Sequence, residues 1–254
     1  MRHGILVTAI LGYEHPIRGR DLRASMPPVR WSAVAPSRPL RLRTSAVAML
    51  VAVAAFVALF VLSVRAYPGG TAWDPAARGH HFWLNYLCDL TRGVALNGEP
   101  NPVGSILGQA GMVALALGLL PLWWLLPHLF PSRARLGIAV RVLGSLTSPG
   151  AIAVTLMPSD RFGAWHSVAI MLAGPPGLLA ALLAVAGLVR EERGLRVAAA
   201  IGAAMLLTAA IDFFLYLSYL SGTGPMVVAV LERGALILLL AWMVTVSLRA
   251  GSGR

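Results

Sequence analysis

Long apolar stretches recur along the chain from residue 44 almost to its end, separated by short segments rich in Arg, Pro, Gly and Ser. A helix needs about 20 apolar residues to cross the hydrocarbon core of a bilayer, so each stretch predicts a transmembrane helix. The six predicted spans are residues 44–65, 104–126, 137–157, 166–189, 197–220 and 226–248. Together they predict an all-α fold, a polytopic membrane bundle of six transmembrane helices.

These spans divide the chain into three parts. Residues 1–43 hold eight arginines and several prolines but no sustained helical pattern, which predicts a basic, disordered tail. Residues 44–248 form the predicted membrane domain, and residues 249–254 form a second, short tail. Because the number of spans is even, both tails are expected on the same side of the membrane.

The composition agrees with a membrane protein. Apolar residues make up 57% of the chain and charged residues only 12%, whereas soluble domains are about 25% charged. The net charge of +11 comes entirely from arginine, since the 21 basic residues include no lysine. These arginines lie in the first tail and in short loops, which favours a membrane topology over nucleic-acid binding.

The arginines also predict the orientation. Most of them lie in residues 1–43, 131–136, 190–196 and the second tail, on one side of the six spans. The other side holds Arg78, Arg92 and Arg161. The positive-inside rule therefore predicts a cell (inner) membrane protein with both termini cytoplasmic, its arginines near anionic lipid headgroups.

Full charges interrupt the last two spans. Asp212 lies about 12 Å from the outer end of the fifth span, and Glu232 and Arg233 lie at a similar depth in the sixth. Charges inside hydrocarbon are costly, so they face a bundle interior or a water-filled cavity. We expect Asp212 to pair with Arg233, with Tyr216 on the same helical face as Asp212. The cluster is either a structural ion pair or a functional, proton-handling site.

The connection after the first span is also unusual. His81, Asn85 and Asp89 recur every four residues among aromatic and aliphatic side chains, which predicts a short amphipathic helix at the outer interface. Its polar stripe either faces water or roofs an outer cavity. The single cysteine, Cys88, cannot form a disulfide within the chain.

A third polar group, Asp160 and His166, lies between the third and fourth predicted spans. Histidine and carboxylate side chains bind Zn²⁺ or Mn²⁺, and metal-bound water is a nucleophile at neutral pH. His80, His81, Asp160 and His166 are therefore candidate metal ligands, and Asp89, Asp160 and His166 are candidate catalytic residues. Their spacing matches no compact motif such as H-E-x-x-H.

Several short motifs resemble a known family. They are residues 85–90 (NYLCDL), Asn101-Pro102, and Met157-Pro158-Ser159-Asp160 followed by His166. This pattern resembles a family of six-span bacterial membrane proteins of unknown function, broadly similar to the Frag/DRAM type of eukaryotic membrane protein. Cys88 stands where the family pattern has Ser. The resemblance implies the same six-span architecture over about residues 44–248, and Asn85, Asp89, Asp160 and His166 as site residues.

Three functions are compatible with these patterns. The first is an outward-facing polar cavity, without a cofactor, that engages a membrane lipid or a membrane-protein partner. The second is an intramembrane lipid hydrolase dependent on Zn or Mn. The third is a small transporter in which Asp212 or Glu232 carries a proton. The hydropathy excludes a soluble enzyme and a nucleic-acid-binding protein.

Overall fold

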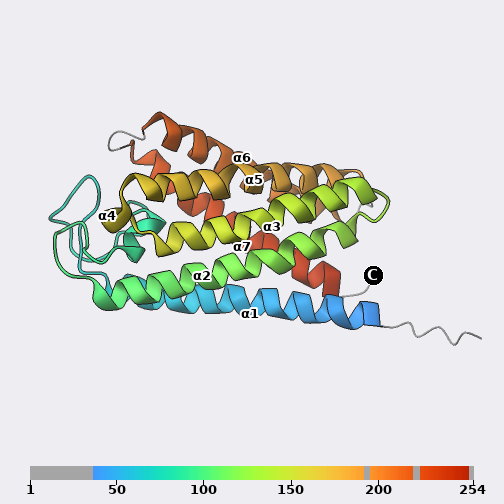
Figure 1. Ribbon diagram of the computed structural model, residues 1–254, viewed down its shortest axis with the longest axis horizontal. Helices are drawn as coiled ribbons and strands as arrows, with labels where there is room; N and C mark the ends of the chain where they lie inside the picture. The colour runs from blue at the N-terminus through green and yellow to red at the C-terminus, as the bar shows by residue number, and fades with distance from the viewer. Residues whose placement is uncertain (1–36, 192–194, 220–223, 252–254) are drawn as a thin grey trace, which may run out of the picture. The chain divides into compact units, whose positions relative to one another are not determined.

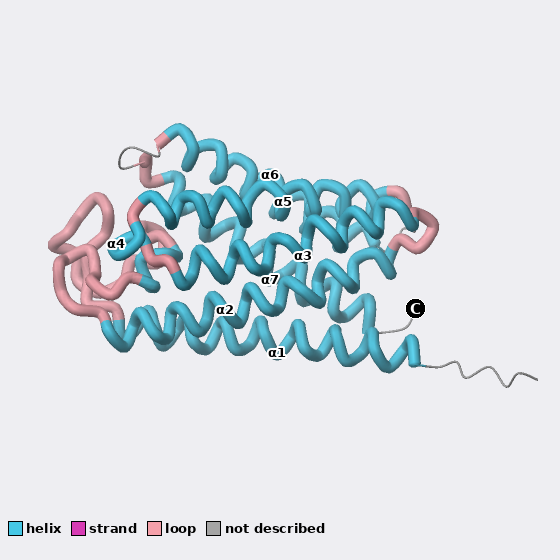
Figure 2. Tube along the Cα trace, in the orientation of Figure 1, coloured by secondary structure: helices cyan, strands magenta, loops and turns pink. Residues whose placement is uncertain are grey.

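A computed structural model of the protein describes residues 37–191, 195–219 and 224–251, all within one compact unit that spans Pro36–Arg254. The predictions for residues 1–36 and 252–254 lie outside the described residues. Most of the described chain is helical (Figures 1 and 2). Its α-helices are α1 (Ser37–Ala66), α2 (Pro102–Leu125), α3 (Ala134–Leu156), α4 (Ser159–Phe162), α5 (Ala164–Val189), α6 (Arg196–Ser218) and α7 (Val227–Gly251).

Six of these helices match the predicted spans. By length and composition, α1, α2 with the short 3₁₀ helix η3 (Leu126–Leu129), α3, α5, α6 and α7 can each cross a membrane. The prediction of an all-α bundle with six spanning helices is therefore confirmed, and its class is that of a multi-pass membrane protein. The first helix begins at Ser37, before the predicted residue 44, because arginine is a good helix former and Arg41 and Arg43 continue the helix beyond its apolar part.

The six long helices form a closed ring. Each packs against its neighbours in the order α1, α2, α3, α5, α6 and α7, and α7 packs back against α1. Glycines allow close approach at several crossings, as expected for helices in lipid. A Cβ atom on Gly144 of α3 would collide with the Trp123 ring of α2, and one on Gly202 of α6 would lie 2.8 Å from the Trp242 ring of α7.

The ring is filled at one end. Leu122, Leu126, Leu188 and Trp242 are at most 1% exposed there, and the Trp242 ring meets Trp123 edge-on, with ring centroids 6.3 Å apart. At the other end, the connection between α1 and α2 folds over the bundle. We call residues 67–101 the cap, and the end of the bundle that it covers the cap end.

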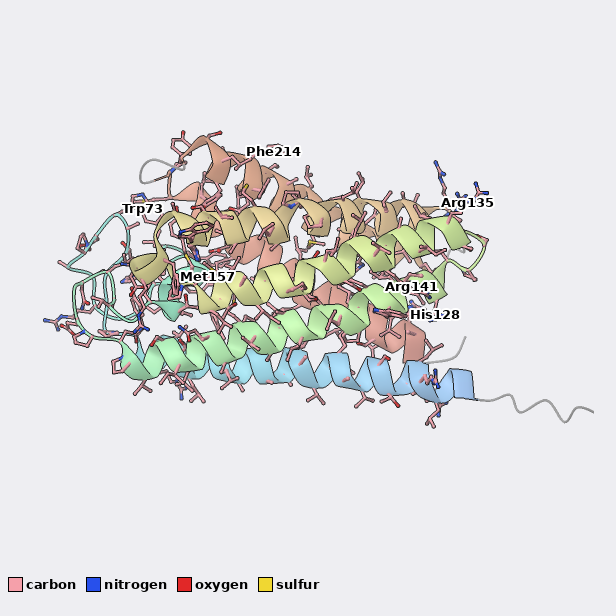
Figure 3. All side chains as sticks on the ribbon, in the orientation of Figure 1. Trp73, His128, Arg135, Arg141, Met157 and Phe214 are labelled. Carbon is pink, nitrogen blue, oxygen red and sulfur yellow. The ribbon has the colours of Figure 1, made fainter. Side chains whose placement is uncertain are left out.

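The cap is a compact loop structure rather than an extended linker. Two isolated β-bridges, Gly69 with Arg78 and Val94 with Pro100, close its turns, and η2 (Leu87–Thr91) is a short 3₁₀ helix within it. At Gly70 the backbone has φ of +87°, and a Cβ atom there would collide with the backbone of Asn97. Figure 2 shows these loops gathered at one end of the helices. In Figure 3, Trp73 and Met157 lie at the cap end and Arg135 and Arg141 at the other.

Candidate binding cavity

A cavity of about 780 Å³ lies inside the ring at the cap end. Its wall comes from α2, α3, α4, α5, α6, α7 and the cap. Polar side chains line the part near the cap: Asp89, Arg92, Ser159, His166, Ser167, Asp212, Tyr216 and Glu232. Apolar side chains line the deeper part: Met112, Leu119, Trp123, Ile170, Leu178, Ala181, Met205 and Leu239. We call these two parts the polar zone and the apolar zone.

The cavity is long as well as large. Along α5, its wall runs from His166 to Ala181, a distance of about 22 Å at a rise of 1.5 Å per residue. The hydrocarbon of one leaflet is about 15 Å thick, half of a typical bilayer core. The cavity, with both of its zones, is therefore longer than the hydrocarbon of one leaflet is thick, and the buried tryptophans Trp123 and Trp242 mark where the ring closes.

Arg233 fastens the cap to α7. Its side chain is fully buried, donates hydrogen bonds from Nε to the Phe82 carbonyl (2.8 Å) and from Nη2 to the Asn85 carbonyl (2.7 Å), and forms an ion pair with Glu232 at 3.5 Å. Its guanidinium also lies over the rings of Phe60 and Phe82, 5.7 and 5.5 Å from their centroids. Glu232 in turn accepts a hydrogen bond from the Leu87 backbone N–H (2.8 Å).

The predicted pairing of Asp212 with Arg233 is wrong. Successive residues on a helix point about 100° apart, so when Glu232 faces the cavity, Arg233 faces the cap and α1 instead of α6. Arg233 pairs with Glu232, whereas Oδ1 of Asp212 has no hydrogen-bond partner within the described part of the chain. The depth argument did place Asp212 and Glu232 correctly on the wall of one cavity.

A second link between helices lies one turn from Asp212. Tyr216, one turn further along α6, shares a hydrogen bond with Ser167 of α5 (2.9 Å between hydroxyl oxygens). Asp212, Tyr216 and Ser167 all line the polar zone. The predicted common face of Asp212 and Tyr216 is thus the face that borders the cavity.

Asn85 and Asp89 hold the cap together. Asn85 is fully buried, donates from Nδ2 to the Gly70 carbonyl (2.8 Å) and to the Asp89 carboxylate (3.1 Å), and accepts from the His81 backbone N–H (2.8 Å). Asp89 also accepts from the Tyr86 N–H (2.8 Å). Burial raises the pKa of Asp89, and these hydrogen bonds oppose that shift.

The predicted amphipathic helix is therefore only partly correct. The helical part is the short η2, and a turn precedes it. His81 is exposed whereas Asn85 and Asp89 are buried, so the three do not form one water-facing stripe. The polar stripe was predicted either to face water or to roof an outer cavity. The structure agrees with the second alternative, because Leu87, Cys88 and Asp89 line the cavity. Burial raises the pKa of the Cys88 thiol well above its usual range, which makes that thiol a poor nucleophile.

His166 opens α5 and points its ring at the same cavity. The side chain is 4% exposed, and Nδ1 lies 2.7 Å from the Met157 carbonyl oxygen. A carbonyl oxygen only accepts hydrogen bonds, so Nδ1 is the donor of this pair. Nε2 has no partner among the described residues.

Asp160 has a structural place at the rim. Its Oδ2 accepts hydrogen bonds from the backbone N–H groups of Gly93 (2.9 Å) and Val94 (3.2 Å), so it ties α4 to the cap. Arg92 makes a parallel tie, donating from Nη1 to the Ser159 hydroxyl (3.1 Å). Asp160, a candidate catalytic residue, thus already accepts hydrogen bonds from two backbone N–H groups.

The four candidate metal ligands do not converge. His80 packs edge-on against the rings of Phe60 and Tyr67, 6.2 and 5.7 Å away, and burial lowers its pKa to about 3, helped by the nearby positive charge of Arg233. Within residues 37–191, 195–219 and 224–251, no group of three His, Cys, Asp or Glu side chains could hold a metal ion. The Zn or Mn hydrolase therefore receives no support from the geometry.

Three residues of the cavity were missed from the sequence: Ser167, Arg92 as a rim contact, and Trp123. Trp123 is 3% exposed, and its Nε1 has no hydrogen-bond partner in the described chain. No local pattern identifies these residues, because each reaches the cavity through helix packing.

Comparisons with known proteins give no indication of function, so the function is inferred from the site. No protein-family model, no curated protein and no solved structure matches the chain. The resemblance to six-span bacterial membrane proteins stays a prediction.

Proposed function

We propose that this protein is a multi-pass inner-membrane protein that holds one amphiphilic molecule, a membrane lipid, in its cavity. The lipid headgroup occupies the polar zone under the cap, and an acyl chain occupies the apolar zone. No cofactor is needed for this function.

The division of the cavity into two zones carries the proposal. Small-molecule sites are concave, commonly 300–1,000 Å³, mostly apolar, and contain a few polar groups that fix orientation. This cavity has that size and that division, with polar groups such as His166 and Asp212 at one end and side chains such as Leu119 and Met205 at the other. A polar metabolite would leave the apolar zone unmatched, and a pure hydrocarbon would leave the polar zone unmatched.

The arginines support an orientation for this lipid site. Arg41, Arg43, Arg135 and Arg196 lie near the end opposite the cap, in α1, α3 and α6. By the positive-inside rule this end is cytoplasmic, where the arginines meet anionic headgroups, and both termini lie there. The cap and the polar zone then face the extracytoplasmic side. A membrane-protein partner is compatible with this arrangement but is not required by it.

Native mass spectrometry of the detergent-purified protein tests the proposal. The wild-type protein should carry one lipid through mild delipidation. Ala209→Phe and Ala151→Phe, which fill the cavity from α6 and α3, should lose it. Ala203→Phe is the matched control, because Ala203 is an exposed residue of α6 outside the cavity.

Two results would overturn the proposal. One is a wild-type protein that carries no lipid. The other is equal lipid occupancy in the control and in both cavity-filling variants, provided that thermal unfolding shows the variants to be folded.

A further inference from the structure

We propose that the polar zone selects a lipid whose headgroup carries a primary ammonium group, with N–H donors as well as positive charge. This inference rests on the proposed lipid-binding function and names the class of headgroup. Its basis is a set of hydrogen-bond acceptors on the cavity wall that have no donor of their own.

The first acceptor is His166. Its Nδ1–H donates to the Met157 carbonyl at 2.7 Å, and in the tautomer with its proton on Nδ1 the other nitrogen, Nε2, offers a lone pair. That nitrogen is buried, has no partner among the described residues, and belongs to a side chain on the cavity wall. A buried acceptor without a donor is costly, so the site is complete only when a ligand supplies an N–H or O–H.

The second acceptor is Asp212. Its Oδ1 is buried without a hydrogen-bond partner in the described chain, and it too lines the cavity. A carboxylate inside a membrane needs a cation, a proton or hydrogen-bond donors. Within the described residues, the structure contains no ion pair at Asp212, because Arg233 is engaged elsewhere.

Both acceptors border the polar zone, from the neighbouring helices α5 and α6. Ser167, next to His166, is hydrogen-bonded to Tyr216, and Asp212 lies one helical turn, about 6 Å along the axis, further from the cap than Tyr216. Each acceptor suits an N–H donor, and an ammonium group carries three such donors on one atom.

The remaining charges of the polar zone disfavour a purely anionic headgroup. Its carboxylates are Asp89, Asp212 and Glu232, of which Glu232 is paired with Arg233, and the cation on its wall is Arg92. Arg92 already donates from Nε to the Val94 carbonyl (3.2 Å) and from Nη1 to Ser159. An anion in the polar zone would face like charges.

The test uses three lipids with identical acyl chains. Phosphatidylethanolamine carries an ammonium with N–H donors, phosphatidylcholine carries a cation without them, and phosphatidylglycerol has hydroxyl donors and a net negative charge. Competition for the purified protein is measured by native mass spectrometry. Hydrogen bonds to charged groups predict that phosphatidylethanolamine is favoured by about tenfold or more over each of the others.

Variants separate headgroup selection from lipid binding. Asp212→Asn and His166→Phe should each bring phosphatidylethanolamine close to parity with phosphatidylcholine. Asp74→Asn, an exposed aspartate of the cap outside the cavity, should keep the preference of the wild type.

Three outcomes would overturn the inference: equal binding of phosphatidylethanolamine and phosphatidylcholine by the wild type, equal or tighter binding of phosphatidylglycerol, or an unchanged preference in both variants. A wild type that binds no lipid at all would instead contradict the proposed function.

Discussion

Replacement of Arg233 tests how the cap is held on the bundle. Arg233→Met keeps the length and the apolar stem of the side chain but removes the guanidinium. The substitution removes the hydrogen bonds to the Phe82 and Asn85 carbonyls, the ion pair with Glu232 and the contacts of the guanidinium with two aromatic rings. The substitution leaves Glu232 in place without its cation, and leaves two carbonyl groups of the cap without their donor.

The expected cost follows from this geometry. Removal of one partner from a buried ion pair destabilises a protein by about 3–5 kcal/mol, because the other charge stays buried. For a chain of this length, 1 kcal/mol corresponds to about 2–4 °C in Tm. We therefore expect the apparent Tm in detergent to fall by about 6–20 °C.

A second readout reports on the cap itself. Cys88, the only cysteine, lies on the side of the cap that faces the cavity, so its labelling by a maleimide should be faster in Arg233→Met. Arg196→Met, at an exposed position at the start of α6, is the matched control and should change neither quantity. The double variant Glu232→Gln/Arg233→Met should lose less stability than the sum of the losses in the two single variants. A Tm within about 2 °C of wild type, together with an unchanged labelling rate, would refute this account of Arg233.

Three further predictions concern the cap and the orientation. The folded protein keeps His80 neutral, with its pKa lowered to about 3. The stability that neutral His80 contributes is therefore complete above its ordinary pKa near 6.5 and is lost as the pH falls towards 3, by up to about 1.4 kcal/mol per pH unit. Thermal unfolding of His80→Phe should depend less on acid than that of the wild type, and an identical pH dependence would contradict this assignment. Asp160→Ala should lower stability by about 1 kcal/mol, whereas Asp160→Asn, which keeps an acceptor for two backbone N–H groups, should stay close to wild type in the same assay. In a Cys88→Ser background, a membrane-impermeant maleimide added to intact cells should label Glu99→Cys at the cap and spare Arg135→Cys at the opposite end, and the reverse pattern would invert the proposed orientation.

The membrane architecture could be predicted because it is encoded locally. Each span is a continuous apolar stretch, and its length alone identifies it. The ends of the helices were less predictable. Arg41 and Arg43 are polar yet continue α1, since helix formation does not stop where hydrophobicity does.

The cap could not be predicted because its contacts join residues far apart in the chain. Asn85 is bonded to the Gly70 carbonyl, and Arg233 to the carbonyls of Phe82 and Asn85. A carbonyl is present in every residue and leaves no pattern in the sequence. The four-residue spacing of His81, Asn85 and Asp89 is real, but the turn before η2 directs His81 outward and the other two inward.

The depth of the intramembrane charges could be predicted from the sequence, but the predicted pair, Asp212 with Arg233, was wrong. Hydropathy and rise per residue give the depth of Asp212, Glu232 and Arg233, but they do not give the rotation of each helix. That rotation depends on the packing of α7 against both α1 and α6. The cavity itself arises from the packing of five long helices, α4 and the cap, which no single segment specifies.

Photocrosslinking tests the central claim, that a lipid chain occupies the interior of the ring, most directly. The protein is reconstituted with phosphatidylethanolamine that carries a diazirine in its acyl chain, and the crosslinked residues are identified by mass spectrometry. The account predicts adducts on Leu119 and Met205, which line the cavity and are only 8% and 7% exposed. Adducts confined to outward-facing residues such as Leu117 and Leu207, which are 50% and 64% exposed, would contradict it.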